Sequence, residues 1–146
     1  SKRKKIVNYI DVDHLGTHGW NGGVCGRDGC IYGIPAQASR ILKYNPTIPI
    51  NYKKRDDYDS NNPENPTLVG DHFGNDSMKW SGGVLVKDCI YGIPCESSKV
   101  FRYNTRSGTT TFYGNGYKIK RDKWWGGVRD NRDNIFAIPS SADKVL

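Results

Sequence analysis

Two of the three histidines lie in matching tetrapeptides, Asp13-His14-Leu15-Gly16 and Asp71-His72-Phe73-Gly74. An aspartate beside a histidine is a pair that can transfer protons or bind a metal ion. The same pair also suits a structural role, in which the imidazole holds a turn through hydrogen bonds to the backbone. We favour the structural role, because the pair is repeated along the chain whereas an active site occurs once.

A second group of residues combines positive charge with an aromatic ring near the C-terminus. Cations beside an indole ring can bind an anionic glycan or a phosphate backbone. The alternative is a solvated loop beside a buried Trp125. Both interpretations stay open, and we take the group as a candidate ligand-binding surface. Its members are Lys118, Lys120, Arg121, Lys123 and Trp124.

A third candidate surface lies in a polar stretch at about residues 48–66. Charged side chains followed by Asn and Pro are typical of an exposed loop. We expect this loop and the Lys118 to Trp124 group to form a contact surface on one face of the fold. The candidate ligand-binding residues of the loop are Lys53, Lys54, Arg55 and Tyr58.

The remaining titratable residues do not favour catalysis. Asp28, Asp88, Asp130 and Asp133 flank expected hairpin turns, where turn chemistry explains them. The chain contains no nucleophile elbow, no phosphate-binding loop and no zinc-protease motif. We therefore predict no catalytic residues.

The four cysteines are Cys25, Cys30, Cys89 and Cys95. The gaps within each pair are four and five residues, whereas zinc sites usually show a two-residue gap. We favour buried free thiols over one disulfide or a metal site, and we predict no metal and no cofactor.

The formal charge is +7, from 22 basic and 15 acidic side chains. Four of the basic residues lie within residues 1–5, which we treat as a basic tail. This tail is either a solvated terminus or a contact for a polyanion. No apolar stretch approaches the ~20 residues that a membrane-spanning helix needs, so we predict no membrane span.

Comparison of the chain with itself shows one pattern three times. Each copy has a tryptophan, two glycines and a valine, at 20–24, 80–84 and 124–128, and then an apolar segment that ends in proline, at 31–35, 90–94 and 135–139. We take the repeated tryptophans to be Trp20, Trp80 and Trp125, with Gly22, Gly23, Gly82, Gly83, Gly126 and Gly127 as the repeated glycines. These tryptophans either stack on sugar rings or bases or pack between units, and we favour packing.

The spacing of the copies predicts short strands. Val24 to Val84 spans 60 residues and Val84 to Val128 spans 44, so the first unit carries an insertion at about 48–66. Periods of 40–50 residues with recurrent Gly and Pro favour four strands per unit over helices. Residues 6–10 match the segment at 67–69, which predicts that the N-terminus supplies the outer strand of a unit split between the two termini. We expect one all-β domain over residues 6–146.

The motif Gly-Gly-Val, a turn with Asp or Asn, and Ile-Tyr-Gly-Ile-Pro resembles the repeats of β-propeller proteins, with kelch-like and NHL-like blades the most similar. It is not a strict kelch match, because Pro35, Pro94 and Pro139 stand where a kelch unit has paired glycines. The resemblance covers essentially the whole chain and implies three blades. Known propellers use at least ~4 blades, so it further implies a homodimer with a six-bladed ring or a part of a larger ring.

This resemblance implies a non-catalytic recognition module that binds a glycan or protein partner through its inter-strand loops. The first alternative is a hydrolase or lactonase-type propeller enzyme with a metal ion in its channel. The second is a structural subunit of a large assembly, with the basic tail bound to a neighbour.

Overall fold

The computed structural model describes residues 9–48, 65–75, 77–114, 116 and 121–146. Within these ranges the protein is all-β, apart from one short 3-10 helix, η1 (Asp13–Leu15). The strands form three antiparallel sheets, two with four strands and one with two. No helix in these ranges is long and apolar enough to cross a membrane.

Each sheet is a meander whose neighbouring strands follow one another in the sequence. The first contains β1 (Trp20–Cys25), β2 (Ile31–Pro35), β3 (Ile41–Tyr44) and β4 (Thr67–Val69). The second contains β5 (Trp80–Val86), β6 (Cys89–Pro94), β7 (Val100–Asn104) and β8 (Thr110–Tyr113). The third contains β9 (Trp124–Arg129) and β10 (Ile135–Pro139). Their Val, Ile, Thr, Tyr and Phe residues are those that favour strands.

The opening hairpin has the same register in all three sheets. Trp20 pairs with Pro35, Trp80 with Pro94, and Trp124 with Pro139, and in each hairpin the register shifts before the second glycine. The first glycine of each pair, such as Gly82 with a φ of 74°, has the left-handed backbone that suits this bulge.

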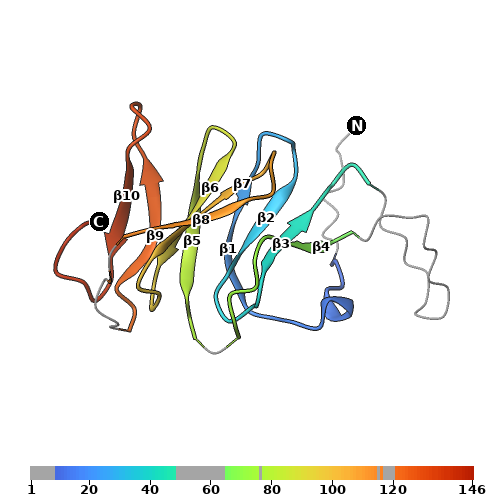
Figure 1. Ribbon diagram of the computed structural model, residues 1–146, viewed down its shortest axis with the longest axis horizontal. Coiled ribbons are helices and arrows are strands. Elements are labelled where there is room, and N and C mark those ends of the chain that lie inside the picture. The colour runs from blue at the N-terminus through green and yellow to red at the C-terminus, as the bar shows by residue number, and fades with distance from the viewer. Residues whose placement is uncertain (1–8, 49–64, 76, 115, 117–120) are drawn as a thin grey trace, which may run out of the picture.

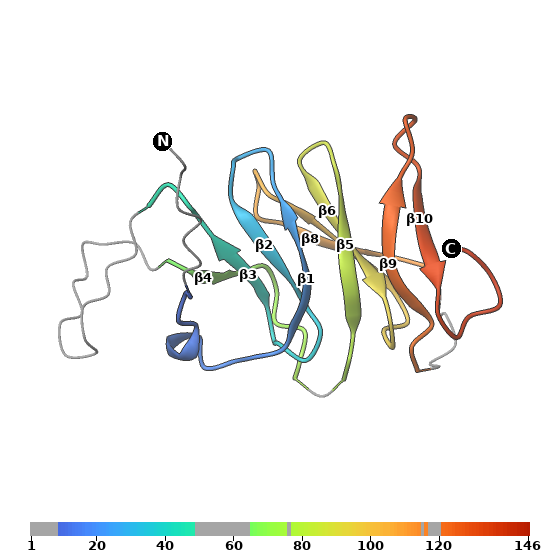
Figure 2. The same cartoon turned by 180° about the vertical axis from the view of Figure 1, so that it is seen from behind.

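The sheets stack face to face in a row, with β1, β5 and β9 next to one another (Figure 1; seen from behind in Figure 2). The first strands approach very closely at their glycines. A Cβ atom added to Gly22 would lie 3.0 Å from the Cα atom of Gly82, and one added to Gly82 would lie 3.1 Å from the Cα atom of Gly126.

Two apolar cores fill the spaces between the sheets. The first core joins Tyr32, Ile34 and Ile41 of the first sheet to Trp80, Ile90, Phe101 and Tyr103 of the second. Phe73, from the connection between these sheets, packs edge-on against Trp80 and stacks on Phe101 at ring distances of 5.0 and 5.7 Å. The second core contains Val84, Ile93, Trp124 and Ala137.

The two ends of the chain differ from the predicted split unit. Leu146 exchanges backbone hydrogen bonds of 2.9 and 3.3 Å with Ala137, but residues 140–146 form no strand, so the expected third strand is not shown. Residues 6–8 lie outside the described residues, and Tyr9 and Ile10 belong to no strand. Since η1 lies beside the first sheet, at the far end of the row from β10 (Figure 1), the described N-terminal residues do not complete the third sheet.

Candidate functional site

The antiparallel strands give the stack two distinct ends. The turns at 26–30, 87–88 and 130–134 join the first two strands of each sheet, and we name this the hairpin end. The loops at 36–40, 95–99 and 140–145 lie at the opposite end, with the connections between sheets, and we name this the junction end. Figure 1 shows the three hairpin tips together at the top.

The two predicted ligand-binding segments are attached to opposite ends. The insertion leaves β3 after Tyr44 and returns at Thr67, at the hairpin end. The Lys118 to Trp124 group joins β8 to β9, at the junction end. Lys53, Lys54, Arg55, Tyr58, Lys118 and Lys120 lie outside the described residues. Our expectation that both segments lie on one face is therefore corrected by the strand order.

Trp124, not Trp125, is the repeated tryptophan. Its indole Nε1–H donates to the Lys144 carbonyl at 2.8 Å, as those of Trp20 and Trp80 donate to the Arg40 and Lys99 carbonyls at 2.9 and 2.8 Å. Trp124 is 7% exposed and Trp125 is 49% exposed. Our assignment of Trp125 to the repeat and of Trp124 to the ligand-binding group is corrected accordingly.

Lys123 is also buried rather than available to a ligand. Its ammonium donates to the Ser97 carbonyl at 2.8 Å and to the Glu96 carbonyl at 3.4 Å, both in a loop of the second sheet. Lys79 does the same one sheet earlier, with bonds to the Gly74 and Gln37 carbonyls at 2.8 and 3.3 Å. Burial lowers the pKa of Lys123. Each of these two lysines therefore ties its sheet to the loop of the preceding sheet.

The two histidines contact backbone atoms. His14 Nε2 lies 3.0 Å from the Pro66 carbonyl oxygen, and His72 Nδ1 accepts from the Gly74 amide at 3.3 Å. The two tetrapeptides differ in secondary structure, because residues 13–15 form η1 whereas residues 71–74 contain no helix or strand. Within the described ranges, no three His, Cys, Asp or Glu side chains gather in a way that could hold a metal ion.

One grouping of titratable side chains surrounds Asp28 at the first hairpin. The Tyr32 hydroxyl donates to the carboxylate at 2.8 Å, and the Lys43 ammonium lies 3.4 Å from it. Burial would raise the pKa of Asp28, but hydrogen bonds from Tyr32 and the Cys30 amide lower it overall. Burial and the neighbouring carboxylate raise the pKa of both Tyr32 and Cys30. The tyrosine and thiol therefore stay protonated, which makes them poor nucleophiles and bases.

The four thiols are free, but our prediction that all of them are buried is wrong for Cys25. Cys30, Cys89 and Cys95 are buried, and Cys25 is exposed. Burial, together with a hydrogen bond from Cys95 to Asp122, raises the pKa of Cys95 to about 11. A thiol with a raised pKa is a structural apolar group rather than a reactive one.

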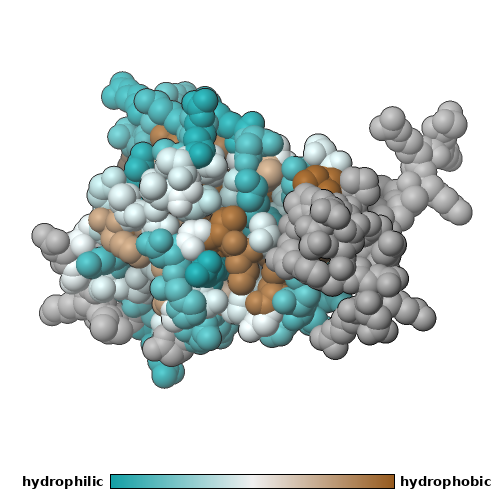
Figure 3. Space-filling model, turned by 45° about the vertical axis from the view of Figure 1, so that its right-hand side comes forward, coloured by the Kyte–Doolittle hydropathy of each residue, from teal (hydrophilic) through white to brown (hydrophobic). Residues whose placement is uncertain are grey.

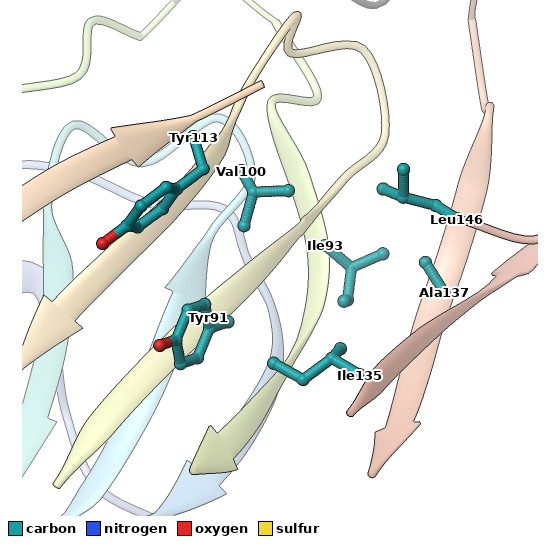
Figure 4. Close-up of a pocket in the computed structure, with 7 residues that line it drawn as sticks. All are labelled: Tyr91, Ile93, Val100, Tyr113, Ile135, Ala137 and Leu146. Carbon is teal, nitrogen blue, oxygen red and sulfur yellow. The ribbon is translucent and has the colours of Figure 1, made fainter. Parts of the chain in front are cut away.

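An apolar hollow of about 170 Å³ lies between the second and third sheets (Figure 4). Its lining comes from Tyr91, Ile93, Val100, Tyr113, Ile135, Ala137 and Leu146. The matching space between the first and second sheets is filled by Phe101 and Tyr103 from β7. Leu146 stands at the register position of Phe101, so the hollow lies beyond the last paired residue of the third sheet.

Sequence reasoning missed a row of cations at the hairpin end. Arg27, Lys87 and Arg132 are exposed, one in each hairpin turn. Three aspartates of these turns are already paired within their own sheets, Asp28 with Lys43, Asp88 with Arg106 and Asp133 with Arg129, at 3.2 to 3.5 Å. Figure 3 shows hydrophilic residues gathered over this end. The repeated segments on either side of the turns already place one cation in each turn, and the fold brings the three turns to one end.

The junction end carries a matching row. Arg40, Lys99 and Lys144 are exposed at equivalent positions of the three loops. These loops also contain Glu96 and Asp143, which partly offset their charge. The sequence matches no family model and no curated protein.

Proposed function

We propose that the chain forms three blades of a β-propeller and acts as a non-catalytic recognition module for an anionic glycan. Two features support the propeller. Two units are four-stranded antiparallel meanders and the third is a two-stranded hairpin, and the first strands of successive units lie side by side. In a propeller the first strands surround the central axis, where glycines permit the close approach of backbones. Gly22, Gly82 and Gly126 occupy such positions here.

The chemistry of the described side chains supports recognition over catalysis. The Asp28 carboxylate is held by Tyr32 and Lys43, and the Asp130 carboxylate accepts hydrogen bonds from Arg132 and Asn134 within its own turn. These groups stabilise hairpins. No specific observation favours the hydrolase alternative.

The observation that carries the proposal is the row of Arg27, Lys87 and Arg132 at the hairpin end. A repeated unit presents one cation per blade, which suits a ligand whose own charges repeat, such as a sulfated or carboxylated glycan. Three of the four turn aspartates are paired with other cations, and only Asp130, which stays ionised because hydrogen bonds within its turn lower its pKa, partly offsets the charge of this row. An acidic protein surface is the alternative partner of the same chemistry.

The test uses two matched triple variants that remove equal charge from opposite ends. Arg27→Gln, Lys87→Gln and Arg132→Gln together remove the hairpin row, and Arg40→Gln, Lys99→Gln and Lys144→Gln remove the junction row. We expect the hairpin variant to weaken binding to a sulfated heparin-type glycan at least about tenfold at low salt and to lower the salt dependence, with little effect from the junction variant.

Each result has a distinct meaning. If only the junction variant binds the glycan more weakly, the binding surface lies at the junction end and the proposed hairpin row is wrong. Equal binding by all three proteins, or an absence of binding by the natural sequence, would contradict the proposed glycan recognition.

A further inference from the structure

The outward face of the third sheet is apolar and exposed. Val128, Phe136 and Ile138 are 57%, 42% and 47% exposed, and Val128 pairs directly with Phe136 across the hairpin. We name these three residues the apolar face.

The same three register positions are covered in the other sheets. In the first sheet they hold Val24, Tyr32 and Ile34, which lie in or against the first core, and Ile34 is 0% exposed. In the second they hold Val84, Tyr91 and Ile93, and Ile93 is 2% exposed. What covers these positions is the next sheet in the row.

In each covering sheet, one glycine lies directly opposite the covered isoleucine. A Cβ atom on Gly83 would lie 2.6 Å from Ile34 Cδ1, and one on Gly127 would lie 2.8 Å from Ile93 Cδ1. Each isoleucine therefore occupies a space that the glycine of the next sheet leaves open. The space beside two of the three glycines at this position is filled in this way.

The third glycine, Gly23, faces outward on the first sheet. A Cβ atom there would meet only atoms of its own sheet, at 3.5 and 4.0 Å. Beside it lies Ile31, which is 39% exposed, whereas its second-sheet equivalent Ile90 is 0% exposed. We name Gly23 and Ile31 the glycine face.

The backbone repeats the same complementarity. The Lys79 amide donates to the Ala36 carbonyl at 3.2 Å, and the Lys123 amide donates to the Cys95 carbonyl at 3.2 Å. The matching donor on the first sheet is the Gly19 amide, and the matching acceptor on the third sheet is the Ser140 carbonyl. Likewise, a Cβ on Gly22 or Gly82 would meet the next sheet, but one on Gly126 would meet nothing within 4 Å.

We propose that the apolar face of one copy binds the glycine face of a second copy, head to tail, with Ile138 seated over Gly23. We expect the partner to be a second copy because one chain exposes both surfaces of the interface that joins its own neighbouring sheets. These surfaces are the apolar face of the third sheet and the glycine face of the first. This proposal rests on the proposed propeller. A ring closed by copies of the three described sheets alone contains a multiple of three blades, and the ~4–8 blades of typical propellers allow only six. Two copies then form two identical interfaces.

The experiment measures the mass of this chain in solution by sedimentation over a wide concentration range. The natural sequence is expected to show a two-chain mass. Ile138→Lys places a charge on the apolar face, where it is exposed in a single copy, and Gly23→Leu fills the seat for Ile138 with a Cβ that would make only ordinary contacts in its own chain. Each variant is expected to raise the dissociation constant at least about 100-fold. Thr109→Lys, at an exposed position of the β7 to β8 turn, is the control and should keep the two-chain mass.

The pattern across the variants separates head-to-tail binding from its alternatives. If two apolar faces bound each other, Ile138→Lys alone would dissociate the pair and Gly23→Leu would have no effect, which would overturn the proposal. A single-chain mass for the natural sequence at about 100 μM, or a mass that keeps rising with concentration, would overturn it too. Near-ultraviolet circular dichroism of each variant verifies that it is folded.

Failure here is distinguishable from failure of the proposed recognition. If the protein has a single-chain mass and its glycan binding still depends on the hairpin row, the proposed binding of a second copy is wrong and the proposed recognition is supported. If the protein has a two-chain mass and binds no glycan, the proposed recognition is wrong and the binding of a second copy is supported.

Discussion

Ile34 fills the space that Gly83 leaves open on the neighbouring sheet, with its Cδ1 atom 2.6 Å from the place of a Cβ on that glycine. The first glycine of each pair is required by the backbone, whereas the second glycine at Gly83 and at Gly127 is required by a side chain of another sheet. Cores are packed so closely that one added methyl group forces its neighbours to move.

We predict that Gly83→Ala lowers the free energy of unfolding by about 1–3 kcal/mol. Ile34→Val removes the Cδ1 atom that the new methyl group would strike, so the double variant should be more stable than the sum of the single effects predicts. Gly23→Ala is the matched control and should change stability by less than about 0.5 kcal/mol. All variants are unfolded by urea in the Ile138→Lys background, which excludes effects on the proposed binding of a second copy. An equal loss at Gly23 and Gly83 would contradict the packing argument.

Adjacent tryptophans should respond very differently to the same substitution. Trp124→Phe removes the hydrogen bond to the Lys144 carbonyl and part of a buried ring, so we expect a loss of about 1–2 kcal/mol in the free energy of unfolding. Trp125→Phe changes a ring that is 49% exposed, and a loss below about 0.5 kcal/mol is expected. Guanidinium unfolding followed by circular dichroism measures both. The opposite order would restore Trp125 as the repeated tryptophan.

The thiol of Cys95 should make stability depend on pH in the alkaline range. Burial raises its pKa from 9.0 to about 11 in the folded protein, so the folded state holds the proton more tightly than the unfolded chain. Its contribution is therefore complete below pH 9 and is lost as the pH rises through 11, by at most about 3 kcal/mol.

The check is urea unfolding between pH 7 and 11 for the natural sequence and for Cys95→Ala. The variant is less stable at pH 7 because it loses buried atoms, but its stability should fall less steeply as the pH rises. Cys25→Ala, which alters an exposed thiol, should keep the natural slope. Identical slopes for the natural sequence and Cys95→Ala would exclude this thiol as a cause of alkaline destabilisation.

Replacement of Lys87 by glycine should stabilise the second hairpin. Its φ of 54° lies in the left-handed region, which costs a residue with a Cβ about 1–2 kcal/mol. Glycine adopts this conformation freely but loses more entropy on folding, so we expect a net gain of about 0.5–1 kcal/mol. Lys87→Ala retains the strain and should be close to neutral. The midpoint of thermal unfolding compares the three proteins, and equal gains for alanine and glycine would assign the effect to the lost charge instead.

The strands were predictable because their signals are local. Gly and Pro recur at fixed positions, and β-branched and aromatic residues lie between them, so the β9 to β10 hairpin was expected where it occurs. The choice of Trp124 over Trp125 was already local, because Trp20 and Trp80 each stand two residues before the first glycine of their pair, and our assignment of Trp125 overlooked that spacing. The pairing of Trp124 with Pro139 shows the same equivalence in space. The role of Lys123 was not local, because its partners are carbonyl groups of another sheet.

By itself, the amino-acid sequence determined that the protein is all-β, that its unit recurs three times, and where each hairpin turns. Tertiary structure alone decided which faces of those units are covered. Strand formation depends on neighbours along the chain, whereas exposure depends on what another sheet places opposite, and for that reason Ile34 and Ile138 share one motif but differ from 0% to 47% in exposure.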